Sequence, residues 1–168
     1  MPRERGKKGT FMDESQDHAL GLSRGGFGSK LHVLTDGLGN VLQVIVTAGN
    51  RNECPVFASL VGSAVRNHGR RPECLAGDKG YSSDEIRDAL VGCGIKPVIP
   101  MRANEHVDDR DRWGEFDKQA YKGRNVIERA IGKLKEFRRV ATRYEKLAES
   151  FIGMVSVAVA MIYLRQVL

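Results

Sequence analysis

The sequence predicts an α/β fold in which helices flank a mixed β-sheet. Two β-branched runs on either side of a glycine-rich turn predict an antiparallel hairpin, and two later apolar runs alternate with amphipathic helical segments. Helical periodicity then dominates the C-terminal third of the chain. With 168 residues, of which 41% are hydrophobic and 29% charged, the chain has the length and composition of one globular domain.

Residues 1–29 predict a flexible basic arm. They are rich in Gly, Lys, Arg, Ser and Asp, show no hydrophobic period, and contain no apolar run of the kind that a secretory signal needs. The sequence SRGGFGSK at 23–30 exposes glycine amides but lacks the spacing of a nucleotide-binding phosphate loop. We therefore expect a glycine-rich turn leading into a domain that spans residues 30–168.

The hairpin is predicted at residues 30–35 and 41–48. Both runs are β-branched and apolar, and DGLGN between them supplies the residues of a tight turn. Asp36 stands at the mouth of this turn, where aspartate commonly accepts hydrogen bonds from the local backbone, so we expect a turn role there rather than a metal site. His32, inside the first run, is expected to be a packed residue and not a metal ligand.

Helix and strand alternate in the middle of the chain. Pro55 can open a helix, and apolar residues at helical spacing extend it over 56–67. Residues 73–77 fit a short interior strand that ends just before Asp78, and two serines then cap another helix. A further strand is predicted at 95–100, followed by a polar loop. Asp78 thus falls between the carboxyl end of a strand and the amino end of a helix, where sites of α/β proteins gather.

The stretch 121–146 predicts an amphipathic, strongly basic helix. Arg124 and Glu128 lie four residues apart and share a face, while Lys135 follows two turns later. Beyond them lie further cations at Arg138, Arg139, Arg143 and Lys146. A solvated helix face is the usual explanation of such a run of charge, and a surface that binds a polyanion is the alternative.

The last helical segment, 151–168, is apolar and nearly long enough to cross a membrane, but glycine, serine, arginine and glutamine interrupt it. We predict a closing helix buried in the core, with no membrane contact. The three cysteines are widely spaced and lack a metal-binding pattern, which is typical of reduced thiols in a cytoplasmic protein. The formal net charge of +6 favours DNA as the partner.

The spacing Tyr121-(2)-Arg124-(3)-Glu128-(6)-Lys135 resembles the motif around the third acidic residue of bacterial insertion-sequence transposases of the DDE type. The similarity is to insertion-sequence family five, within the broader group of families four and five. It extends over most of the chain, in the expected order, through GLSRGGFGSKLHVLTDGLGN at 21–40, VIVTAGNRNE at 45–54, AGDKGYSSDEI at 76–86, KPVIPMR at 96–102 and FRRVATRYEKLA at 137–148.

This resemblance implies a ribonuclease H-like fold with a site for divalent cations, either Mg²⁺ or Mn²⁺ as a substitute. An enzyme of this kind cuts DNA at the ends of the element and joins these ends to target DNA. The resemblance assigns Asp78 and Glu128 as catalytic metal ligands. Residues expected to contact DNA are Tyr121, Arg124, Lys135, Lys79, Arg138, Arg139 and Arg143. The more C-terminal of these basic side chains would bind phosphates without reading sequence.

The chain departs from the family pattern at its beginning. The family's first catalytic aspartate lies on a strand upstream of GLSRGGFGSK, and neither Asp13 nor Asp17 sits in an apolar run that could be this strand. We therefore expect a partial catalytic domain that lacks its first strand and is nearly inactive alone. Either the product of an upstream reading frame completes this domain, or the chain is a decayed remnant. Its expected protein partner is the upstream product or a second copy of the chain.

Two other interpretations stay open. A non-catalytic DNA-binding fragment could regulate or inhibit a full-length transposase, and replacing Glu128 by Gln would separate this function from an enzymatic one. A protein that associates with membranes through residues 151–168 is a third hypothesis, which partition into detergent would reveal.

Overall fold

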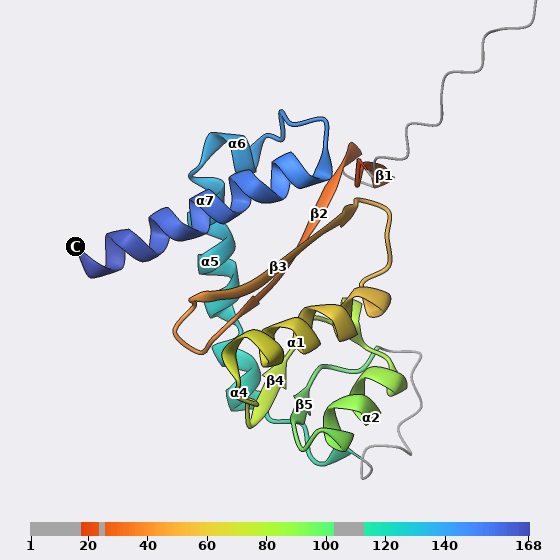
Figure 1. The fold of residues 1–168 in the computed structure, drawn as a ribbon. Helices are drawn as coiled ribbons and strands as arrows, with labels where there is room; N and C mark the ends of the chain where they lie inside the picture. The colour runs from red at the N-terminus through yellow and green to blue at the C-terminus, as the bar shows by residue number, and fades with distance from the viewer. Residues whose placement is uncertain (1–17, 24–25, 103–112) are drawn as a thin grey trace, which may run out of the picture.

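The computed structural model describes residues 18–23, 26–102 and 113–168. Asp13, Asp17 and part of the predicted loop at 102–120 lie outside the described residues. In chain order the elements are β1 (Gly21–Ser23), β2 (Gly26–Thr35), β3 (Val41–Ala48), α1 (Cys54–His68), β4 (Cys74–Ala76), the 3₁₀ turn η1 (Lys79–Tyr81), α2 (Asp84–Gly92), β5 (Lys96–Val98), α4 (Lys118–Gly123), α5 (Asn125–Lys135), α6 (Arg138–Ala141) and α7 (Ala148–Val167) (Figure 1).

The predicted hairpin forms β2 and β3, which pair antiparallel with Leu31 opposite Val46 and Val33 opposite Val44. Its turn is held by Asp36, whose side chain accepts hydrogen bonds from the backbone amides of Leu38 and Asn40 at 2.9 and 2.8 Å. The local role predicted for Asp36 is therefore confirmed.

The first strand begins earlier than the predicted boundary at residue 30. β2 starts at Gly26, and its first residues pair with β1, with Leu22 opposite Phe27. Glycine disfavours a strand on its own, but a neighbouring strand supplies the hydrogen bonds that order it. Residues 21–23 and 26–29, which were predicted to belong to the flexible arm, are thus part of the sheet.

The hairpin lies between two groups of helices. Alternate residues of β2 face opposite sides of the sheet, and each side packs on one group. Val33 packs into a core with Leu134 of α5, Val140 of α6 and Phe151 of α7. Leu34 points the other way, into a core built by α1, β4, α2 and the segment around β5; its buried members are Phe57, Leu75, Ile86, Leu90, Ile95 and Ile99. This layering of helices around strands is compatible with a ribonuclease H-like domain (Figure 1).

The strands do not form the single mixed sheet that was predicted. Among the described residues, β1, β2 and β3 make one antiparallel sheet, while β4 and β5 pair parallel in a second sheet. The two sheets contact the same core through Leu34 and Leu75, yet no described strand connects them by backbone hydrogen bonds.

The predicted helix over 121–146 is broken into three. α4 and α5 follow each other almost directly, but Phe137 adopts extended backbone (ψ 108°) and ends α5. Thr142 is again extended (ψ 106°) after the single turn of α6. The break turns Val140 into the core beside α7, a packing gain that helix propensity alone does not anticipate.

The closing helix α7 is confirmed, but its burial is only partial. Phe151, Val155 and Ala158 face the core, whereas 17% of the most apolar 18-residue window is buried. By length and composition this helix is also long enough to cross a membrane. The core contacts of its inner face tie it to the rest of the domain.

Candidate active site

Asp78 lies where the sequence placed it, directly after β4. The amide of Gly77 still bonds the carbonyl of Val98 on β5 at 3.2 Å, and the chain then leaves the sheet. Asp78 is exposed and caps η1, since its carboxylate accepts a hydrogen bond from the amide of Lys79 at 2.6 Å. Ser83 caps α2 in turn by accepting from the amide of Ile86. Asp78 therefore sits on a short, well-defined turn between strand and helix.

A buried histidine holds this turn against the hairpin. His32 of β2 is 1% exposed, and its Nδ1 and Nε2 atoms each lie 2.9 Å from a hydroxyl, that of Tyr81 and that of Thr47 respectively. Burial, and next the positive charge of Lys30, hold the pKa of His32 below its ordinary value of 6.5. Burial is also the main cause that raises the pKa of Tyr81 to about 12. The prediction of a packed role for His32 is confirmed.

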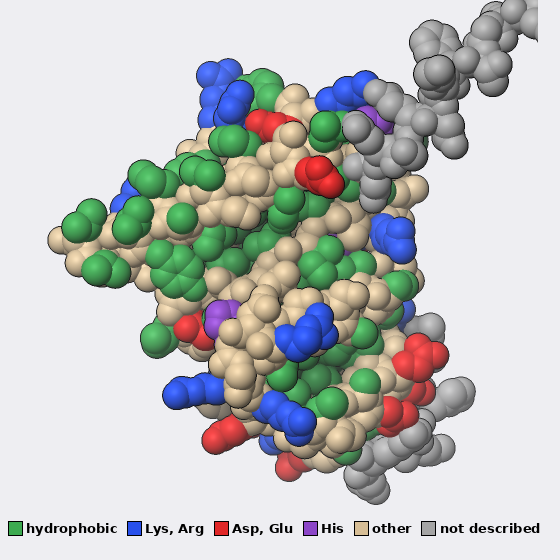
Figure 2. Space-filling model, in the orientation of Figure 1, with side chains coloured by type: hydrophobic (Ala, Val, Ile, Leu, Met, Phe, Trp, Pro, Cys, Tyr) green, Lys and Arg blue, Asp and Glu red, His purple; other side chains and the backbone are tan. Residues whose placement is uncertain are grey.

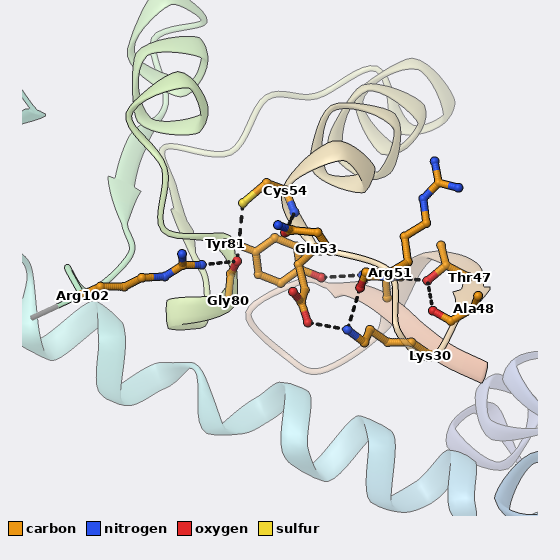
Figure 3. Close-up of polar contacts among 11 residues, drawn as sticks. Lys30, Thr47, Ala48, Arg51, Glu53, Cys54, Gly80, Tyr81 and Arg102 are labelled. Atoms are coloured by element: carbon orange, nitrogen blue, oxygen red, sulfur yellow. Dashed lines mark hydrogen bonds and ion pairs between the residues drawn. The ribbon is translucent and has the colours of Figure 1, made fainter. Parts of the chain in front are cut away.

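A second set of contacts fixes the same turn from the start of α1. Lys30 pairs with Glu53 at 2.6 Å and also donates to the carbonyl of Arg51 (Figure 3). Burial opposes the ionisation of Glu53, but the hydrogen bond and charge of Lys30 keep its pKa below the usual value. Glu53 packs beside Gly80, where an added Cβ would lie 3.4 Å from its side chain, and the Cys54 thiol donates to the Gly80 carbonyl.

Arg102 holds the turn from the opposite side. Its guanidinium donates to the carbonyls of Lys79 and Gly80, both at 3.0 Å (Figure 3). Sequence reasoning missed the roles of Lys30, Glu53 and Arg102. The segments AGNRNE and KPVIPMR contribute to the family resemblance, but the sequence gives no sign of what their side chains contact. The contacts of Lys30 with Glu53 and of Arg102 with Gly80 each join residues more than 20 positions apart.

The other acidic residue, Glu128, lies on the exposed face of α5. Its side chain is 63% exposed and pairs with Arg124 one turn earlier at 2.9 Å. Arg124 also stacks over the ring of Tyr121, with 5.4 Å between guanidinium carbon and ring centre. The structure therefore brings Tyr121, Arg124 and Glu128 together. Lys135 is exposed at the end of α5, roughly 10 Å further along the axis at the usual helical rise.

The remaining basic residues have different surroundings. Arg138 is exposed and donates to the hydroxyl of Tyr144, and the mostly exposed Arg139 pairs with Glu145 at 3.6 Å. Arg143 is half-buried and donates to backbone carbonyls of His18, Ala19, Glu145 and Lys146 and to the hydroxyl of Ser29. Arg143 thus ties the beginning of the described chain to the segment before α7, while Arg138 and Arg139 face solvent.

Comparison with known proteins decides the family. The family model described as "Transposase DDE domain" matches residues 6–164. The chain belongs to the DDE transposase family. Two relatives are each 34% identical to it. One, from Brucella ovis, is named "Putative transposase for insertion sequence element IS6501", and the match covers 82% of this chain and 98% of that protein.

The other relative, from Burkholderia cepacia, is named "Putative transposase for insertion sequence element IS402". This match covers 73% of the chain and 56% of that protein, so the chain spans about half of this relative. No solved structure matches the chain significantly. An insertion-sequence transposase is therefore the class to which the chain is similar over most of its length.

DDE transposases use divalent metal ions, and the donor chemistry here suits them. Asp78 and Glu128 are carboxylates on exposed positions, and oxygen ligands with retained waters are what Mg²⁺ prefers. Within the described ranges, however, no group of three or more acidic, His or Cys side chains gathers into a ready site. Asp78 and Glu128 each offer the oxygen ligands that such an ion prefers, but no contact joins the two side chains in the part of the chain that the structure describes.

Proposed function

We propose that this chain forms most of the catalytic domain of an insertion-sequence transposase, acting in the cytoplasm on the terminal repeats of its element and on target DNA. It would cleave phosphodiester bonds at the element ends and transfer the strands. One observation carries the proposal: the Asp78 turn and the Glu128 helix are both built on β2. His32 of β2 holds the Asp78 turn through Tyr81, and Val33 of β2 packs on α5.

In this proposal Asp78 and Glu128 hold Mg²⁺, with Mn²⁺ as a substitute. The metal would activate the attacking oxygen and stabilise the departing one. Arg124 would orient Glu128 through their ion pair. The contacts of Glu53, Cys54 and Arg102 with the 79–80 backbone fix the direction in which Asp78 leaves its strand.

A further carboxylate would complete the site, on a strand that fits between β2 and β4. Support comes from the separation of the two sheets: among the described residues, no strand pairs with β4 on the edge away from β5, and none joins β4 to β2. A strand seated there would pair with β4 and with the part of β2 after Gly28, because β1 already pairs with Gly26, Phe27 and Gly28. We propose that an upstream segment supplies it, and that the described chain alone is inactive.

DNA would lie along the exposed basic side of α4 to α6. Tyr121 and Arg124 lie beside Glu128, and Lys135 lies further along α5. All three would hold the strand near the scissile phosphate, and Lys79 would add charge beside Asp78. Arg138 and Arg139 would bind more distant phosphates, with affinity that falls steeply with salt. The carbonyl contacts of Arg143 favour a structural role for it instead of the DNA contact that was predicted.

The test joins the chain to the upstream segment that is proposed to complete it. Translating the DNA upstream of the Met1 codon in three frames should reveal an apolar strand that ends in aspartate. The joined protein is expected to cut element-end DNA with Mg²⁺, and Asp78→Asn or Glu128→Gln should reduce cleavage to background while binding persists. Glu149→Gln, a change of an exposed carboxylate on α7, is the matched control and should cut normally. Efficient cleavage by the chain alone would contradict the proposal.

A second candidate is a DNA-binding fragment that regulates a full-length transposase. The exposed basic side chains of Arg138 and Arg139 support it, because phosphate contacts need no catalytic centre. Such a fragment should inhibit transposition equally well with Glu128→Gln, whereas an enzymatic contribution would disappear. Inhibition that requires Arg138 and Arg139 but not Glu128 would therefore support the regulatory function.

A further inference from the structure

Of the three arginines between α5 and α7, Arg138 is the one whose charge the fold does not use. Arg139 pairs with Glu145 at 3.6 Å, and Arg143 donates to backbone carbonyls. Arg138 is exposed, and in the part of the chain that the structure describes it pairs with no acidic side chain. Figure 2 shows Lys and Arg side chains projecting from the surface in the region where Figure 1 places α6. A polyanion can therefore bind Arg138 without breaking an ion pair of the fold.

A tyrosine nevertheless holds the guanidinium of Arg138 in one place. The Nε atom of Arg138 donates to the hydroxyl of Tyr144 at 3.1 Å, and the guanidinium carbon lies 6.0 Å from the centre of the Tyr144 ring. Within the described ranges, the two terminal nitrogens of Arg138 have no acceptor. These nitrogens form the side of the guanidinium that bonds a phosphate with two parallel hydrogen bonds. A side chain that is oriented before binding loses less freedom when the ligand arrives.

The fold presents Tyr144 at the surface from two anchored neighbours. Arg143 bonds carbonyls at the beginning of the described chain, and the side chain of Glu145 is only 11% exposed. Tyr144 between them is 55% exposed despite its large apolar ring. Its hydroxyl accepts the hydrogen bond of Arg138 and can still donate its own hydrogen, for which the described residues supply no acceptor.

We propose that Arg138 and Tyr144 together bind one phosphate of the DNA backbone, with Tyr144 as the positioning residue. The terminal nitrogens of Arg138 and the hydroxyl of Tyr144 would donate to the same phosphate group, while the bond to Nε keeps the guanidinium directed at it. This inference rests on the proposed function, in which DNA lies along the exposed side of α4 to α6. It adds a residue that charge patterning does not reveal, because tyrosine carries no charge.

A phosphate within a polymer suits this pair better than a free phosphate ion. Arg138 and Tyr144 lie on an exposed surface, where one arginine and one hydroxyl hold an ion weakly against water. The exposed cations Lys135 and Arg139 lie nearby in the chain and can bind further phosphates of the same strand. Contacts of this kind fix the position of the duplex without reading its sequence, so the pair should act on DNA of any sequence.

A double-mutant cycle measured by fluorescence anisotropy with a labelled DNA duplex tests the proposal on the full chain. Tyr144→Phe keeps the ring but removes the hydroxyl, and should raise the dissociation constant about 3- to 10-fold. Arg138→Ala should raise it about 10-fold and lower the salt dependence by about one phosphate contact. In the Arg138→Ala background, Tyr144→Phe should change the dissociation constant less than about 2-fold, because no phosphate is then held within reach of the hydroxyl.

Tyr163→Phe is the matched control. It removes the hydroxyl of a partly exposed tyrosine on α7, which donates to the carbonyl of Val41 at 3.0 Å, and should leave DNA binding unchanged. Arg138→Lys is a second background: it keeps the charge but has no Nε to bond the hydroxyl, so Tyr144→Phe should have little effect there as well. Circular dichroism and urea unfolding establish that each variant is folded, and Tyr144→Phe should unfold at the wild-type urea concentration.

The possible outcomes separate this inference from the proposed function. Weaker binding by Arg138→Ala together with wild-type binding by Tyr144→Phe would overturn the role of Tyr144 and leave the proposed DNA surface standing. Effects of the two substitutions that multiply in the double variant would show independent contacts, and would overturn the positioning role. Unchanged binding in both single variants would overturn the inference and the proposed DNA surface together.

Discussion

The free energy of unfolding of the wild type should fall as the pH is lowered, and it should fall less in the His32→Gln variant. His32 is almost completely buried between Tyr81 and Thr47, and its pKa lies below the ordinary 6.5 because burial, and then Lys30, disfavour the charged ring. In the unfolded chain the ring takes up a proton below a pH of about 6.5. The unfolded state then binds more protons than the folded one, so the free energy of unfolding falls as the pH falls.

The size of the effect follows from the linkage. Each pH unit between the unfolded and folded pKa values of His32 removes at most about 1.4 kcal/mol of stability. Glutamine can hydrogen-bond both hydroxyls but does not titrate. The His32→Gln variant should therefore start less stable at pH 8, by about 1–2 kcal/mol for imperfect packing and hydrogen bonding, and then lose less stability than the wild type towards pH 5.5.

Urea unfolding at a series of pH values between 8 and about 5.5 measures this difference, a window that lies above the range where most carboxylates titrate. His68→Gln changes an exposed histidine on α1 and is the matched control, which should follow the wild-type curve. Parallel stability curves for the wild type and His32→Gln would refute the reasoning, since His32 would then bind its proton equally in both states.

Two further predictions concern single side chains. Arg143→Ala should destabilise the fold by about 2–3 kcal/mol, because several backbone carbonyls lose a charged donor, whereas Arg138→Ala should change stability little and weaken DNA binding. Urea unfolding together with gel-shift titration distinguishes the two arginines, and equal stability of both variants would contradict the roles assigned. Gly39→Ala should cost about 1–2 kcal/mol, since Gly39 has φ 89° in the hairpin turn; Gly37→Ala, without a positive φ, should cost less, and equal costs would count against this explanation.

The parts of the fold that the sequence predicts are those determined by neighbouring residues. Asp36 forms the hairpin turn through amides two and four residues away, and Ser83 caps α2 through an amide three residues away. Asp78 follows β4 as predicted, because a short apolar run and a serine-capped helix bracket it. Each of these depends on local chemistry that is visible in a few consecutive letters.

The parts that could not be predicted depend on contacts between distant residues. Phe137 ends α5 although its neighbours favour helix, because the turn it makes buries Val140. Arg143 belongs to a run of cations that predicts a DNA-binding surface, yet it bonds carbonyls more than 120 positions earlier. Charge patterning identifies a basic segment but cannot show which of its members the fold uses for itself.

Strand β2 connects the proposed site residues because its two faces serve different parts of the site. His32 points to the Asp78 turn through Tyr81, while Val33, one residue later, packs on the helix that carries Glu128. A shift of β2 by one residue would turn each side chain to the opposite face and separate both elements from it. The charge-neutral pair of His32 and Tyr81 thus positions a carboxylate without adding a competing charge.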